Sequence, residues 1–137
     1  MSPRDLMTNC AKWLVARGEN QKAVEVLDKM QEIMPASVFP LNTSVISSLT
    51  ERAVMDAISV YIAAGAPDKA EQLADALVAE SEDGIALFGA EYMGDFLASE
   101  DLQRNLYYIY MIADIFEKSN QPELAKKYAD KVSLYLQ

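Results

Sequence analysis

Residues 65–70, Gly65-Ala66-Pro67-Asp68-Lys69-Ala70, decide the fold that the sequence predicts. Glycine tolerates the left-handed conformation that commonly ends a helix. Proline suits the first turn of a following helix, because the N–H that it lacks would have no partner there. The small Ala70 side chain lets two antiparallel helices approach each other closely. We therefore interpret this segment as the tight turn of a helical hairpin.

Two other segments have the same form, at residues 18–23 (Gly-Glu-Asn-Gln-Lys-Ala) and 120–125 (Asn-Gln-Pro-Glu-Leu-Ala). Each places Gly or Asn five residues before an Ala, and each lies between two apolar stripes with helical spacing. No stretch alternates convincingly with period two, so we expect no sheet. The stripes consist of Met7, Cys10, Ala11, Leu14; Ala23, Leu27, Met30, Met34; Val54, Ala57, Ile58, Tyr61, Ile62; Ala70, Leu73, Ala74, Leu77, Val78; Leu102, Leu106, Ile109, Ala113, Phe116; and Ala125, Tyr128, Ala129, Val132, Leu136.

The predicted fold class is all-α, with about seven helices in antiparallel hairpins and one domain over residues 1–137. The predicted hairpins cover about 3–35, 48–80 and 100–136, and an extra helix covers about 85–98 despite the glycines at positions 84, 89 and 94. The first two helices should run over about 3–17 and 20–34. A capping box, Ser48-Leu49-Thr50-Glu51, predicts a helix start near Ser48, with Asn42 as a rival cap.

Charge is concentrated in one section of the chain. The net charge is -9, with a pI near 4.4, and residues 68–101 hold Lys69 as their only basic group beside ten acidic ones. An acidic chain is a poor partner for nucleic acid, which needs clustered Lys and Arg, and for anionic lipid. No segment is long and apolar enough to span a bilayer, and the N-terminal residues lack the apolar run of a signal peptide. The acidic section could instead meet a basic partner surface.

The residue types that usually carry chemistry are scarce. The chain has no histidine and one cysteine, Cys10, which we interpret as a buried structural thiol because no histidine could activate it. The acidic cluster Glu80, Glu82 and Asp83 lacks the pattern of a calcium loop and suits a solvated helix end. We therefore expect no catalytic residue, no metal site and no cofactor, and we expect that the chain is not an enzyme.

Three tyrosines stand close together, at Tyr107, Tyr108 and Tyr110. They cannot all face one side of a helix, so we expect at least one to be partly exposed. Exposed tyrosine often marks a binding surface. The alternative is that all three fill space inside the fold.

The hairpins resemble tetratricopeptide repeats. The first carries Met7, Cys10-Ala11, Leu14, Gly18, Ala23, Leu27, Met30 and Pro35 at the spacing of that 34-residue unit, and the others keep parts of the pattern. The intervals from Ala23 to Ala70 and from Ala70 to Ala125 exceed 34 residues, so inserts separate the units. "Tetratricopeptide-like" is the suitable term. The resemblance implies a right-handed α-α superhelix and a protein-binding scaffold.

In tetratricopeptide arrays, ligands usually lie along the first helices of the hairpins. Mapped onto this chain, that face includes Thr8 and Ser59 and a set of candidate partner-binding residues. The implied partner is a protein or peptide, or another domain of the same parent. The alternative is a small-ligand or peptide binder with an aromatic pocket between helices, lined by Tyr107, Tyr110 and Met55. The candidate residues are Lys12, Arg52, Met55, Tyr107, Tyr110 and Asp114.

A narrower resemblance rests on residues 14–35, on Tyr61 through Lys69-Ala70, and on the final hairpin ending in Tyr135. These segments resemble the soluble C-terminal tail of a family of bacterial multi-pass membrane proteins similar to protein O-mannosyltransferases. The resemblance implies a membrane-tethered parent with this tail on the extracytoplasmic face of the inner membrane. The chain would then be an excised domain whose Met1 is foreign to the parent. An autonomous chain would be cytoplasmic, and its oligomeric state is left open.

Overall fold

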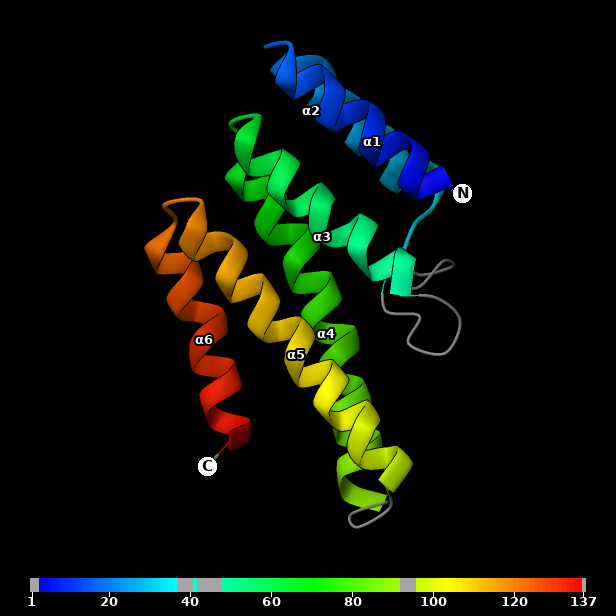
Figure 1. The fold of residues 1–137 in the computed structure, drawn as a ribbon, viewed down its shortest axis with the longest axis vertical. Helices are drawn as coiled ribbons and strands as arrows, with labels where there is room; N and C mark the ends of the chain where they lie inside the picture. The colour runs from blue at the N-terminus through cyan, green and yellow to red at the C-terminus, as the bar shows by residue number, and fades with distance from the viewer. Residues whose placement is uncertain (1–2, 37–40, 42–47, 92–95, 137) are drawn as a thin grey trace. The chain divides into compact units, whose positions relative to one another are not determined.

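The computed structural model describes residues 3–36, 41, 48–91 and 96–136. These residues form helices joined by turns, with no strand among them, so the all-α class is confirmed. The chain divides into two compact units, Met1–Ala76 and Leu77–Gln137. Figure 1 shows the helices, which are α1 (Pro3–Ala16), α2 (Asn20–Ile33), α3 (Ser48–Ala63), α4 (Pro67–Glu91), α5 (Phe96–Lys118) and α6 (Pro122–Leu136).

The three predicted turns have one hydrogen-bond pattern. At each turn the residue in the left-handed region has a positive φ, 80° at Gly18, 85° at Gly65 and 58° at Asn120. The N–H of the next residue donates to a carbonyl five residues back, as from Glu19 to Leu14 at 2.9 Å. The N–H of the turn residue donates to the carbonyl three residues back. This is the Schellman motif, and it satisfies carbonyls that a helix end leaves without partners.

We expect Gly65→Ala to lower the free energy of unfolding by about 1–2 kcal/mol, the cost of the left-handed conformation for a residue with a Cβ. No atom lies within 4 Å of a Cβ built on Gly65, so the cost is one of backbone conformation rather than of a clash. Urea denaturation followed by circular dichroism measures it. Asn120→Gly is the matched control and should be neutral or stabilising, because glycine adopts this conformation freely. Equal destabilisation by both changes would contradict the explanation.

In the first unit, α1 packs against α2 and α3, and α2 contacts α3. The face of α1 that is buried carries Arg4, Thr8 and Ala11. The Arg4 guanidinium donates to the Met34 carbonyl at 3.2 Å, where α2 ends, and the Thr8 hydroxyl donates to the Met30 sulfur at 3.4 Å. A cation is stabilised at the C-terminal end of a helix, where backbone carbonyls lack partners. The first turn of α1 can therefore be buried against the end of α2 although it carries Arg4.

This packing corrects the predicted stripe of α1. Cys10 is exposed, not buried, since it lies about 100° around the helix from the buried Ala11. Met7 and Leu14 are only partly buried. Ala11 is buried as predicted, but apolar spacing alone missed Arg4 and Thr8, which are buried because they find polar partners on α2.

The predicted extra helix at about 85–98 is also corrected. Residues 85–91 continue α4, which is 25 residues long, and Phe96 begins α5. Residues 92–95 lie outside the described part of the chain. Nothing at residues 80–85 stops a helix, because a glycine inside one costs only about 1 kcal/mol and Ser81 and Ile85 are both buried. The described residues therefore form six helices where seven were predicted.

Other boundaries agree closely with the prediction. The α3 helix begins at Ser48, and α1 and α2 each end one residue earlier than expected. The rival cap Asn42 lies outside the described residues. The single domain predicted from chain length stays a prediction.

In the second unit, α5 and α6 pack along each other, and Figure 1 shows them side by side in yellow to red. Ile109 and Ile112 of α5 are buried, and the rings of Phe116 on α5 and Tyr128 on α6 stack with centroids 5.4 Å apart. Glu82 on α4 accepts hydrogen bonds from the Lys131 ammonium at 3.0 Å and the Tyr135 hydroxyl at 3.1 Å. These two contacts join α6 to α4. Among the described residues, no helix is long and apolar enough to cross a membrane.

Candidate interaction groove

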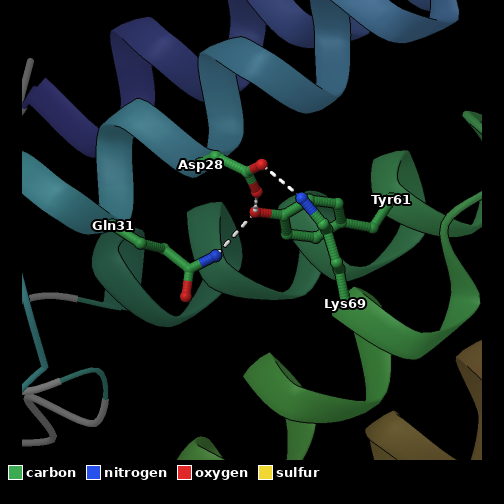
Figure 2. A network of polar contacts seen from close by, with 4 residues as sticks. All are labelled: Asp28, Gln31, Tyr61 and Lys69. Atoms are coloured by element: carbon green, nitrogen blue, oxygen red, sulfur yellow. Dashed lines mark hydrogen bonds and ion pairs between the residues drawn. The ribbon is translucent and has the colours of Figure 1, made fainter.

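A cluster of polar side chains in the first unit surrounds Tyr61 and joins three helices (Figure 2). The Tyr61 hydroxyl donates to Asp28 at 2.7 Å and accepts from the Gln31 amide at 2.6 Å. The Lys69 ammonium bonds the other Asp28 oxygen. The cluster therefore ties α2 to α3 and to the start of α4.

This cluster is suited to holding helices together rather than to catalysis. Tyr61 is fully buried. Burial and the hydrogen bond to the Asp28 carboxylate raise the pKa of Tyr61 well above its ordinary value. A general acid or base needs a pKa near the working pH and access to a substrate, and Tyr61 has neither. The cluster is a structural element of the first unit.

The six candidate residues predicted from the sequence fall into both units. Lys12 on α1 is exposed and forms an ion pair with Asp56 on α3 at 3.3 Å. Met55 on α3 is partly buried, and the side chain of Arg52 lies outside what the structure describes. Of the neighbouring positions on the predicted face, Thr8 is buried. In the first unit, the predicted binding face is thus partly used for packing between α1, α2 and α3.

The structure separates the three tyrosines of α5 into one buried and two exposed residues. Tyr108 is buried, whereas Tyr107 and Tyr110 are each 56% exposed. The rings of Tyr107 and Tyr110 stack with centroids 6.5 Å apart. The alternative in which all three tyrosines fill the interior is therefore wrong, and two aromatic rings lie on the surface of α5.

An open groove of about 480 Å³ lies between α5 and α6, and we call it the α5–α6 groove. Tyr110 and Asp114, two of the candidate residues, line its α5 side together with Ala113 and Glu117. Its α6 side has mostly small or apolar side chains. The residues on that side are Pro122, Ala125, Lys126, Ala129, Val132 and Ser133.

Charged side chains border this apolar floor. Asp114 pairs with Lys118 at 2.9 Å, and Lys126 pairs with Asp130 at 2.8 Å. In both pairs the hydrogen bond to the carboxylate raises the pKa of the lysine. Glu117 forms no salt bridge with any residue in the described ranges, so its carboxylate is available to a partner. The groove thus combines an apolar floor, an aromatic edge and an acidic group.

Sequence reasoning found the α5 side of the groove but missed the α6 side. Ala125, Ala129 and Val132 were assigned to the core, yet Ala129 is exposed and all three line the groove. The signal that could have found them is the recurrence of small residues at Ala125, Ala129 and Ser133, four positions apart on one face. Small side chains at that spacing leave room for another helix.

Within the described ranges, no three His, Cys, Asp or Glu side chains lie close enough together to hold a metal ion. Comparison with known proteins gave no match to a family model, to a curated protein or to a solved structure.

Proposed function

We propose that this chain is a non-enzymatic helical-repeat module for protein–protein interaction, with the α5–α6 groove as its docking site. The observation that carries the proposal is the groove itself, with Tyr110 at its edge and Ala125 and Ala129 in its floor. Exposed tyrosine beside an apolar surface is typical of interface anchors. The volume of about 480 Å³ is also enough for several partner side chains.

The class of partner that suits the groove is an amphipathic helix. The groove has α5 and α6 as its two walls and small residues between them. Such a surface suits a helix-in-groove interaction, in which apolar anchors of the bound helix recur every three or four residues. An extended strand would need exposed backbone donors and acceptors, which the helices of the second unit use internally.

We further propose that the hairpins form a tetratricopeptide-like right-handed superhelix. The three identical Schellman turns support this, because repeated units would be expected to share their turn geometry. We also propose that the chain is the tail of a membrane-tethered parent similar to protein O-mannosyltransferases. This tail would lie on the extracytoplasmic face of the membrane. This proposal rests on the sequence resemblance.

A small-ligand site is the weaker candidate. The proposed aromatic pocket needed Tyr107, Tyr110 and Met55 together, whereas among the described residues Tyr110 alone of these three lines the groove. Drug-sized ligands are usually enclosed over most of their surface, and this groove is open. A docking helix suits it better.

A displayed library of helical peptides with varied apolar stripes tests the proposal. We expect enriched peptides to be amphipathic helices that bind Ala129→Arg at least about ten-fold more weakly than the wild-type chain, the scale of losing an interface anchor. Ala129 is exposed, so the arginine fills the groove without disturbing the core. Fluorescence anisotropy of labelled peptides measures the affinities.

Leu134→Arg is the matched control, because Leu134 is also on α6 and 69% exposed but does not line the groove. It should leave affinity unchanged. Enriched peptides that bind both variants as well as the wild type would refute the groove as the docking site, as would a library that yields no binder.

A further inference from the structure

The exposed face of α1 carries an apolar stripe that no described residue covers. Leu6 and Trp13 are 62% and 58% exposed, and Cys10 between them is exposed as well. Their spacing of four and then three residues places them on one side of the helix. We call Leu6, Cys10 and Trp13 the α1 stripe. Large apolar side chains gathered in this way mark interaction surfaces.

A cation extends the α1 stripe at its C-terminal end. The Arg17 guanidinium lies 4.7 Å from the centre of the Trp13 ring. Arg17 forms no salt bridge with the residues that the structure describes. A partner that covers Trp13 would therefore also meet an unpaired positive charge, and would be favoured if it supplied a carboxylate.

The α5–α6 groove matches the α1 stripe in three respects. The stripe with Arg17 extends from Leu6 to Arg17 and the α6 wall from Pro122 to Ser133, twelve residues each, or about 16 Å of helix. The stripe presents large apolar side chains, and the groove presents small ones. The unpaired charge beside the stripe is positive, whereas the unpaired Glu117 in the groove is negative.

We propose that copies of this chain associate head to tail, with the α1 stripe of one copy docked in the α5–α6 groove of the next. This proposal rests on the proposed function, because both use the α5–α6 groove as the docking site. It adds that the partner is a second copy of the chain. The two surfaces are different, so the contact is heterologous and leaves a free stripe and a free groove at the two ends of each assembly. Such a contact can extend beyond a dimer.

Two natural reporters lie on the α1 stripe, because Trp13 and Cys10 are the only tryptophan and cysteine of the chain. Sedimentation velocity of the whole chain under reducing conditions, from about 1 µM to about 1 mM, covers the range in which small interfaces associate. We expect the mass to rise with concentration. Trp13 emission should shift to the blue and the reaction of Cys10 with a thiol reagent should slow over the same range.

Single variants should each block one surface. We expect Leu6→Glu, which spoils the stripe, and Ala129→Arg, which fills the groove, to stay monomeric when each is alone. Mixed together they should form a one-to-one dimer and nothing larger, because each supplies the surface that the other lacks. Gln21→Glu, at an exposed position on α2, and Leu134→Arg on α6 are the controls and should associate like the wild type.

Charge reversal gives an independent test of the same contact. Arg17→Glu and Glu117→Arg should each weaken association about ten-fold or more. The double variant should regain the affinity of the wild type, because the ion pair between the two copies forms again with the two charges exchanged. Lys29→Glu, at an exposed position on α2, is the control and should have no effect.

A chain that stays monomeric over the whole concentration range would overturn the proposal. So would self-association of Ala129→Arg alone, which would mean stripe-to-stripe contact, or a monomeric mixture of the two blocked variants. These results are separable from the docking function: peptide binding without self-association would retain the groove and reject the second copy as its occupant.

Discussion

Tyr61→Ala should lower the free energy of unfolding by about 3–5 kcal/mol, the usual cost of removing a buried aromatic ring. Tyr61 is fully buried and its hydroxyl bonds Asp28 and Gln31, so the change opens a cavity and leaves two polar groups with fewer partners. Urea denaturation followed by Trp13 fluorescence reports the effect in the unit that contains Tyr61.

Tyr61→Phe separates the hydrogen bonds from the packing. We expect a loss of about 0.5–1.5 kcal/mol, the net range for one hydrogen bond, because the ring remains and the Asp28 carboxylate keeps its ion pair with Lys69. A phenylalanine variant as stable as the wild type would mean that Asp28 and Gln31 are satisfied equally well by water.

The same hydroxyl gives stability a pH dependence. Burial and the Asp28 carboxylate raise the pKa of Tyr61 in the folded chain, so the folded state keeps the proton where the unfolded chain, with an ordinary pKa near about 10, loses it. The contribution is complete below about pH 10 and falls as pH rises above it. The stability difference between wild type and Tyr61→Phe should therefore shrink above pH 10, and a constant difference up to pH 11.5 would contradict this.

The other large effect is expected from Phe116→Ala in the second unit. Phe116 is fully buried and stacks on Tyr128 at 5.4 Å. Its loss should cost about 3–5 kcal/mol for the cavity and the lost ring contact, and it should weaken peptide binding because the two walls of the α5–α6 groove are held together there. Denaturation followed by circular dichroism and peptide anisotropy measure the two effects.

Phe116→Leu is the control for the ring. It keeps most of the apolar volume and should cost less than half as much, with peptide affinity retained. If Phe116→Ala left peptide binding unchanged while destabilising the chain, the stack would support the fold without shaping the groove.

Helix ends were predictable where the signal is local. Gly18, Gly65 and Asn120 adopt the left-handed conformation that their residue types allow, and the helices end beside them. The same reasoning failed between α4 and the extra helix, because Gly84 is too weak a signal to end a helix by itself. Local chemistry therefore determined the hairpins but not the length of α4.

The buried faces of the helices were harder to predict than the helices themselves. The buried face of α1 carries Arg4 and Thr8, and their partners lie on α2, at Met34 and Met30. Hydrophobic periodicity depends only on the residue type at each position of one helix. It therefore does not predict a polar residue that is buried because its partner lies on another helix. For this reason Cys10 was assigned to the buried face of α1, although it is exposed.

The groove illustrates a different difficulty. Tyr110 and Asp114 could be proposed as binding residues from their types and spacing. Ala129 could not, because alanine occurs both in cores and on surfaces. Whether an alanine is covered depends on which neighbour packs over it, and the sequence around Ala129 does not specify that neighbour. The α6 side of the site therefore required the three-dimensional structure.

The bond from Arg4 to the Met34 carbonyl has a consequence for how the chain acquires its structure. It joins residues only 30 positions apart, so the first hairpin can close its own loop as soon as α2 is formed. The entropic cost of closing a loop rises only slowly with its length, so this separation does not prevent early closure. During synthesis, the first hairpin should therefore assemble before α3 has emerged.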